Sequence, residues 1–300
     1  MNPALAMFLE VFGLARDPFL DTADPGFYFE TLSAAHARRR LYDCLASGRG
    51  LAVVVGAIGA GKTTLFNAAA AELVSSPSHL VGQILDPSFA DEAELIVATA
   101  DCFGFALEPG RSVREMKESL KRSLFEEARE RQAILLVDEA QMLPEALLET
   151  LRGLLNFQLD ERKLLAIALS GQRELADAIL RRPNLSDRVA LWIDLAPLRE
   201  SEAAGLVEHR LRTAGYRGER SPFDEDAMRE MWRESGGLPR RLVALAREAL
   251  EVAAERNATI VTASCVALAR TRIVPLAAPR RTQEKAPFVQ RWLRRWRRAS

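Results

Sequence analysis

One segment, "LAVVVGAIGAGKTTLFNAAAAEL" from Leu51 to Leu73, restricts the possible folds of this chain more than any other. An apolar run typical of a β-strand leads into a glycine-rich turn, and an alanine-rich helical stretch follows. The turn fits the pattern G-x-x-x-x-G-K-[ST] from Gly56 to Thr63, between a strand and a helix as that pattern requires. Such a loop curls so that its backbone N–H groups face phosphate oxygens, while the helix presents its positive end to the same charge. We therefore predict a nucleoside triphosphate site.

The residues of this loop are expected to divide the work of binding. Lys62 is suited to reach the β- and γ-phosphates, and the Thr63 hydroxyl is suited to Mg²⁺. ATP and Mg²⁺ are therefore the predicted cofactors. The predicted nucleotide-binding residues are Gly56, Ala57, Ile58, Gly59, Ala60, Gly61, Lys62, Thr63 and Thr64.

A second apolar segment, "AILLVDEAQ", ends in two adjacent carboxylates. Burying a carboxylate is costly unless a partner or a metal compensates, so two in a row at a strand end indicate chemistry. We expect Asp138 to hold Mg²⁺ and Glu139 to act as the general base on an attacking water. No segment resembles a lid for a phosphoryl acceptor, which favours hydrolysis over phosphoryl transfer to a small molecule.

The next apolar segment also ends in polar residues, in "ALSGQREL". Ser170 or Gln172 at this strand end is placed to contact the γ-phosphate or the attacking water. A polar strand end without a catalytic role is the alternative.

The pattern along the chain predicts an α/β fold. Apolar segments alternate with helical ones, which indicates a parallel sheet covered by helices on both faces, and after Pro197 only helical patterns appear. We expect residues 1–50 to be a leader, irregular at first and helical from Ser33 to Ser47. Three further parts are expected after the leader. They are a nucleotide-binding α/β domain over 51–196, a helical lid domain over 197–274 and a linker with a basic tail over 275–300. The expected strands are Leu51–Val55, Leu80–Leu85, Ala133–Val137, Leu164–Leu169 and Val189–Leu195.

Composition narrows the class of protein. The formal net charge is zero, but residues 280–300 contain eight basic residues and one acid, so the first 279 residues carry −7. An acidic body argues against nucleic acid as the first choice of partner, because such binding rests on neutralising phosphates. Three scattered cysteines indicate a reducing compartment, and no apolar run is long enough to span a bilayer. We expect a cytoplasmic protein.

Taken together, these motifs resemble the AAA+ ATPases, and more specifically the general secretion pathway protein A (ExeA-like) family. The resemblance covers about residues 8–255. The segments that carry it are "FGLARDPF" with the aromatic residues that follow, "GAIGAGKTTL", "LLVDEAQML", "LSDRVALWIDLAPL" and "SGGLPRRL".

The resemblance implies two further site residues. Arg188 matches the arginine that such proteins insert into a neighbouring subunit's ATP site, with Arg181 and Arg182 as rivals for this role. Arg240 matches the sensor arginine of the helical domain. Because an arginine acting in trans ties activity to assembly, the resemblance implies a homo-oligomer, as a ring or a filament.

Three functions remain open from the sequence. The first is a Mg²⁺-dependent ATPase that assembles or remodels a partner complex, with a protein partner at the cell envelope. The second is a DNA-associated regulator that resembles transposition helper ATPases. The third, a nucleotide-dependent scaffold without hydrolysis, is disfavoured by the intact Asp138–Glu139 pair.

The tail "PFVQRWLRRWRRAS" predicts a short amphipathic helix on an anionic surface. At about 100° per residue, its apolar and basic residues fall on opposite sides. Such a helix is suited to lie on the inner face of the membrane, with tryptophans at headgroup depth. Docking on a neighbouring subunit, or a basic end without a partner, is the alternative. The apolar side is Phe288, Val289, Trp292, Leu293 and Trp296; the basic side is Arg291, Arg294, Arg295, Arg297 and Arg298.

Truncation after Ala286 tests this expectation. The full chain should sediment with vesicles that contain anionic lipid, and the truncated chain should not. Added salt should weaken the binding, because each arginine near the surface contributes on the order of 1 kcal/mol that salt screens. Equal sedimentation of the two proteins would contradict membrane docking, and loss of oligomers without lipid would favour docking on a subunit.

Overall fold

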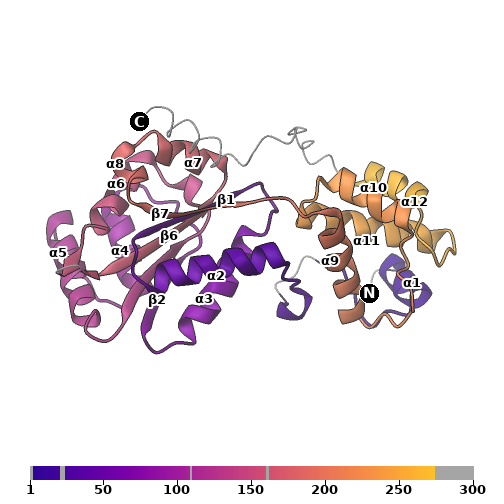
Figure 1. The fold of residues 1–300 in the computed structure, drawn as a ribbon, viewed down its shortest axis with the longest axis horizontal. Helices are drawn as coiled ribbons and strands as arrows, with labels where there is room; N and C mark the ends of the chain where they lie inside the picture. Colours follow the sequence, from indigo (N-terminus) through magenta and orange to yellow (C-terminus); the bar gives the residue numbers. More distant parts are fainter. Residues whose placement is uncertain (1–2, 21–23, 109, 160–161, 274–300) are drawn as a thin grey trace. The chain divides into compact units, whose positions relative to one another are not determined.

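The computed structural model describes residues 3–20, 24–108, 110–159 and 162–273 (Figure 1). The predicted tail helix over 287–298 lies outside the described residues. Contacts divide the described chain into two units. One is an α/β unit of residues 32–57 and 61–195. The other is a helical unit of residues 3–31, 58–60 and 196–273.

The α/β unit is built on a five-stranded parallel sheet, which confirms the fold class predicted from the sequence. Each strand begins and ends within two residues of the segment predicted for it. In spatial order the strands are β2 (His79–Ile84), β3 (Gln132–Val137), β6 (Leu165–Gly171), β1 (Leu51–Gly56) and β7 (Val189–Leu195).

The central strands are buried on both faces, which explains their continuous apolar sequences. In β1, Leu51, Val53 and Val55 contribute to one apolar cluster, while Ala52 and Val54 contribute to the other. This alternation follows from the two-residue period of a strand. Each face therefore needs its own cover of helices.

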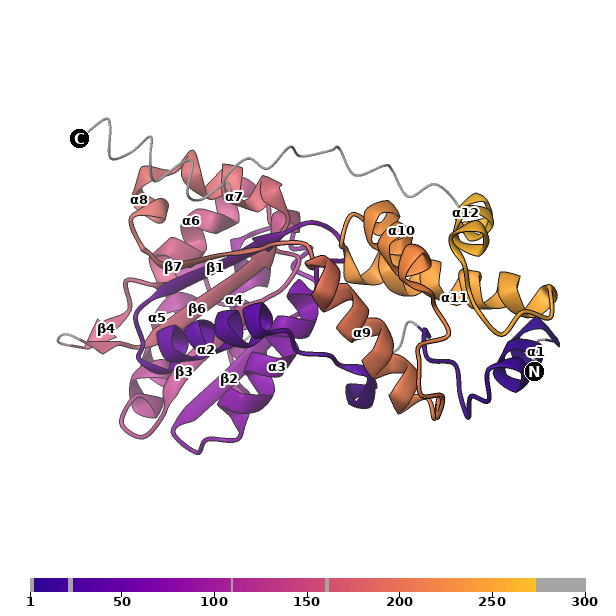
Figure 2. The ribbon, with the colours of Figure 1, turned by 45° about the vertical axis from the view of Figure 1, so that its right-hand side comes forward.

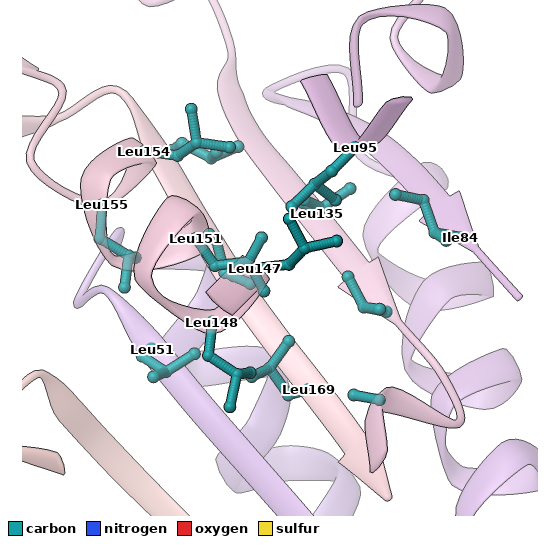
Figure 3. Close-up of a cluster of buried hydrophobic side chains, with 14 of the residues drawn as sticks. Leu51, Ile84, Leu95, Leu135, Leu147, Leu148, Leu151, Leu154, Leu155 and Leu169 are labelled. Atoms are coloured by element: carbon teal, nitrogen blue, oxygen red, sulfur yellow. The ribbon is translucent and has the colours of Figure 1, made fainter. Parts of the chain in front are cut away.

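Helices cover both faces of the sheet (Figure 1). On one face lie α2 (Leu32–Ala46) and α3 (Lys62–Val74), which contact each other. The other face carries the remaining helices of the unit, and Figure 3 shows leucines of α6 against those of the strands. These helices are α4 (Glu92–Cys102), α5 (Val113–Glu127), α6 (Glu145–Leu154), α7 (Arg173–Leu180) and the short α8 (Pro183–Ser186).

The helical unit contains four consecutive helices and the start of the chain (Figure 2). Among the described residues no helix combines the length and hydropathy needed to cross a bilayer. The four helices are α9 (Glu200–Thr213), α10 (Glu225–Ser235), α11 (Pro239–Glu255) and α12 (Ala263–Arg272).

The first residues of the chain correct one expectation. The sequence predicts an irregular segment before Ser33, but Pro3–Val11 forms helix α1, which contacts α11. Apart from Glu10, the nine residues of α1 are apolar, and so short an apolar run does not by itself indicate a helix. Further short elements that the sequence did not indicate are the 3₁₀ turns η1 (Pro25–Phe27) and η2 (Ala140–Met142), and the strand pair β4 (Gln158–Leu159) and β5 (Arg162–Lys163).

The leader is part of the core of the helical unit. Its aromatic side chains Phe8, Phe12, Phe19 and Phe27 are buried in one cluster with residues of α9 to α12. Burying such a side chain contributes about 1.5–3 kcal/mol. The leader therefore stabilises the helical unit directly.

An ion pair fixes the leader against α11. Asp17, whose side chain is 6% exposed, accepts a hydrogen bond of 2.8 Å from Nε of Arg247. The same carboxylate accepts the backbone N–H of Phe19 at 2.8 Å. Arg247 also lies 3.0 Å from Glu251. The buried negative charge of Asp17 is thus compensated by Arg247 and by the backbone N–H of Phe19.

Replacing Asp17 with Asn should loosen the helical unit. Asn keeps the volume and the acceptor for Phe19 but removes the charge that Arg247 binds. A hydrogen bond to a charged group contributes about 1.5–3 kcal/mol, so we expect amide exchange in α11 to rise about 10- to 100-fold. Hydrogen exchange followed by mass spectrometry measures this change.

Asp24→Asn is the matched control. Asp24 pairs with Arg16 at 2.8 Å on the same leader, but both side chains are at least one-third exposed. Exposed pairs contribute little, so exchange in α11 should stay close to that of the unmodified chain. Equal effects of the two substitutions would contradict the assigned role of Asp17.

Candidate nucleotide site

The strand order gathers the predicted site at one edge of the sheet. The carboxyl ends of parallel strands meet at the same edge, where α/β sheets bind their ligands. β6 lies between β1 and β3, with Val55 opposite Gly171 and Val137 opposite Leu169. The polar end of β6 therefore lies between the glycine-rich loop and Asp138.

The loop after β1 has the conformation that phosphate binding requires. Gly59 and Gly61 have φ angles of +77° and +96°, in the left-handed region that favours glycine. α3 begins at Lys62, and Gly61 at its N-cap has no side chain to cap it. The N–H groups of the first turn are thus available to an anion. Thr64 is exposed in this turn, as are Ala57 and Ile58 in the loop.

Lys62 folds back over the loop that precedes it. The residue is only 5% exposed, and Nζ donates to the carbonyl oxygens of Gly56 at 3.2 Å and Ala57 at 3.1 Å. These contacts hold the ammonium group inside the curl of the loop. A phosphate bound in the loop would meet this positive charge.

Thr63 and Asp138 meet across the strand end. The Thr63 hydroxyl donates to Oδ2 of Asp138 at 2.6 Å, and Asp138 is 3% exposed. Oδ1 of Asp138 accepts the backbone N–H of Glu139 at 2.9 Å. Hydroxyl and carboxylate oxygens are ligands that Mg²⁺ prefers, and Mg²⁺ commonly takes one or two protein ligands and completes its shell with phosphates and water. The residues present therefore fit a Mg²⁺ ion.

Glu139 has an unusual backbone conformation. Its φ and ψ are 47° and 33°, which is left-handed for a residue with a side chain. Such conformations cost on the order of 1–3 kcal/mol and cluster at functional sites. The residue is half-buried.

The end of β6 carries the two other predicted residues. Ser170 is fully buried, and its hydroxyl has no hydrogen-bond partner within the described part of the chain. By strand alternation Ser170 faces α2 and α3, as do Ala166 and Ala168. Gln172 is half-buried and forms the N-cap of α7. A buried hydroxyl without a partner is consistent with a ligand contact at this position.

The structure places Arg188 at the opposite edge of the sheet. It precedes Val189, which lies beside Leu51 at the start of β1, whereas the loop follows the end of β1. At about 3.3 Å per residue, β1 separates them by about 16 Å, more than an arginine side chain spans. Arg188 is exposed. The pKa of Lys163 is lowered mainly by the burial of Lys163 itself, and secondly by the positive charge of Arg188.

The two rival arginines are held within the chain. Arg181 lies 2.6 Å and Arg182 2.5 Å from the carboxylate of Glu145 on α6. Hydrogen bonds from Arg182 and then Arg181 lower the pKa of Glu145. Among the described residues, no acidic side chain pairs with Arg188, which is exposed. Its role in a neighbouring subunit stays a prediction.

Arg240 belongs to the helical unit. It is the second residue of α11, exposed, and it follows a turn at Gly236 and Gly237. A Cβ at Gly237 would lie 2.6 Å from the carbonyl oxygen of Leu198, so only glycine fits there. The sensor role of Arg240 stays a prediction.

Gln141 is a site residue that the sequence reasoning missed. Its Nε2 donates to Oε2 of Glu139, and its Oε1 accepts the backbone N–H of Gln172 at 3.0 Å. The signal was present as the last letter of "DEAQ", but only the fold shows that this side chain contacts two other predicted residues.

A known family model matches the part of the chain that contains the candidate site. The family model of an AAA domain covers residues 44–179. General secretion pathway protein A of Aeromonas hydrophila is 31% identical over 84% of this chain. The chain spans only 46% of that relative's length.

Solved structures share the fold at low identity. Cdc6p from Pyrobaculum aerophilum superposes with a TM-score of 0.64 at 16% identity, over 84% of this chain and 72% of that one. The structure of Drosophila ORC bound to DNA superposes with a TM-score of 0.65 at 17% identity, over 90% of this chain and 66% of that one. The sequence matches show that residues 44–179 form an AAA domain and that the chain is a homologue of general secretion pathway protein A.

Proposed function

We propose that this protein is an oligomeric, Mg²⁺-dependent ATPase whose cycle assembles or remodels a partner complex. The observation that carries this proposal is the hydrogen bond between Thr63 and Asp138, with Glu139 next to it. It joins the loop suited to phosphates to the carboxylates suited to metal and water. This is the donor set that hydrolysis of a nucleoside triphosphate requires.

Each residue has a defined task in this proposal. Backbone N–H groups of residues 56–61 and the start of α3 hold the phosphates, and Lys62 exchanges its carbonyl contacts for phosphate oxygens. Thr63 and Asp138 would hold Mg²⁺, which supplies neutralisation of phosphate charge. Glu139 orients and deprotonates the attacking water. Ser170 and Gln172, at the end of β6, are placed to contact the γ-phosphate or that water.

Arg188 completes the site of a neighbouring subunit in this proposal. The sheet itself separates it from the phosphate loop of its own chain, and its exposure leaves it free to enter another. Guanidinium groups stabilise the charge that spreads over the γ-phosphate oxygens. A site shared between chains makes activity depend on assembly into a ring or a filament. Arg240 of the helical unit is proposed as the sensor arginine of the nucleotide site.

The partner is proposed to be a protein complex at the cell envelope. The name of the relative from Aeromonas hydrophila refers to a general secretion pathway, and the resemblance covers most of this chain. We therefore place the protein in the cytoplasm, peripheral to the inner face of the membrane when the tail engages lipid.

ATP hydrolysis measured alone, with anionic vesicles and with duplex DNA tests this proposal. We expect hydrolysis without DNA, and stimulation by vesicles if the tail docks there. Stimulation by DNA alone would favour the DNA-associated regulator, and no hydrolysis under any condition would favour a scaffold.

Lys62→Ala and Glu139→Gln should have different effects. Lys62 contacts phosphate in the bound state, so its loss should weaken ATP binding. Glu139 acts on water, so Glu139→Gln should bind ATP normally and lose about 100-fold or more in kcat, as expected for a general base. Nucleotide titration and steady-state kinetics separate the two. Hydrolysis at the unmodified rate by Glu139→Gln would remove the general-base assignment.

Arg188→Ala should bind ATP but lose about 10³-fold or more in hydrolysis. Mixing it with the Glu139→Gln protein should restore activity, because mixed assemblies contain sites with an intact glutamate and an intact arginine from different chains. Arg181→Ala is the control and should stay active, since Arg181 is bound to Glu145. No recovery in mixtures shown to co-assemble would contradict the trans role.

A further inference from the structure

The carboxylate of Glu139 needs a support that the proposed catalytic residues do not provide. Glu139 is half-buried, and a glutamate side chain has several rotatable bonds. Within the described ranges, the side chain that hydrogen-bonds this carboxylate is Gln141. Catalytic groups work only when held near the productive geometry, and small displacements are costly.

The other end of the Gln141 amide is anchored to β6. Its Oε1 accepts the backbone N–H of Gln172 at 3.0 Å, at the point where β6 ends. Gly171 leaves room for this contact, because a Cβ there would lie 2.7 Å from Oε1 of Gln141. One amide therefore spans the gap between the two strand ends.

The backbone turn after Asp138 makes this geometry possible. Glu139 is left-handed, and the 3₁₀ turn η2 follows at once. Backbone N–H groups of Met142 and Leu143 donate to the carbonyl oxygens of Glu139 at 2.8 Å and Ala140 at 3.2 Å. The chain thus reverses within a few residues, and the Gln141 side chain returns to lie beside the Glu139 carboxylate.

We propose that Gln141 is a positioning residue for hydrolysis, which fixes the Glu139 carboxylate relative to the end of β6. This inference rests on the proposed function of Glu139 as general base. The bond engages Oε2 of Glu139, and no hydrogen bond in the described part of the chain engages Oε1, which is the oxygen that accepts the proton from water. In this proposal Gln141 acts through Glu139 and not directly on nucleotide or water.

The link also couples the base to the γ-phosphate side of the site. Gln172 sits at the strand end predicted to contact the γ-phosphate, and its N–H holds the amide that holds Glu139. A change at this strand end on nucleotide binding is therefore transmitted to the base through one side chain.

Gln141→Met tests the proposal. Methionine has nearly the same length but neither donates nor accepts as the amide does. We expect kcat to fall about 10- to 100-fold, because the base loses its alignment. ATP affinity should change less than about twofold, since no phosphate contact is removed. An unchanged or raised kcat would overturn the proposal.

Gln141→Glu is a second variant that separates the two ends of the bridge. A glutamate still accepts the Gln172 N–H but cannot donate to Glu139, and it places a like charge beside it. The proposal predicts a loss of kcat at least as large as in Gln141→Met. A rate near that of the unmodified protein would show that only the anchor to Gln172 matters, and would overturn the positioning role.

Two comparisons distinguish positioning from general damage. Met142→Ala changes an exposed neighbour in the same turn and should leave kcat within about twofold. In the Glu139→Gln background, Gln141→Met should change the residual rate less than about twofold, because its effect passes through Glu139. A further large loss in that background would contradict the proposal.

The same set of proteins separates failure of this inference from failure of the proposed function. If Glu139→Gln hydrolyses ATP normally, the general-base assignment fails and the inference falls with it. If Glu139→Gln is inactive and Gln141→Met is fully active, the proposed function stands and only the role of Gln141 is wrong.

Discussion

The insertion of β6 between β1 and β3 is the constraint on which the site depends. Neighbouring strands lie about 4.8 Å apart, so one intervening strand separates the phosphate loop from the Asp138 strand by about 10 Å. The side chains of Thr63 and Asp138 span this distance through their hydrogen bond, and the polar end of β6 lies between the two strands. If β3 lay directly beside β1, Ser170 and Gln172 would have no place between loop and carboxylates.

The same strand order explains why Gln141 contacts both Glu139 and the end of β6. The turn after Asp138 and the end of β6 are adjacent in space because β3 and β6 pair in register, Val137 with Leu169. One side chain from the turn then reaches the backbone of Gln172. Proposed base, proposed phosphate contact and the link between them are thus consequences of one strand pairing.

Local patterns in the sequence predicted much of the fold and the first part of the site. The loop from Gly56 to Thr63 and the apolar strands are encoded by consecutive residues, so their boundaries were predictable to within two residues. Strand order is set by non-local pairing, and the sequence offers no signal for it. The contact of Gln141 with Gln172, 31 residues apart, could not be predicted for the same reason. Helix α1 was missed because it is a short run of nine residues that are apolar apart from Glu10, and such a run is equally compatible with a buried strand or an irregular segment.

A crystal structure of the Glu139→Gln protein with Mg²⁺ and ATP tests the central claim most directly. The account predicts the phosphates in the loop between Gly56 and Thr63, with Mg²⁺ about 2.0–2.1 Å from the Thr63 hydroxyl and held by Asp138 directly or through water. The Thr63 hydroxyl binds the metal through a lone pair, so its hydrogen bond to Asp138 should persist if Asp138 holds the metal through water. Nucleotide bound elsewhere, or nucleotide in this loop with the metal held by residues other than Thr63 and Asp138, would contradict the account.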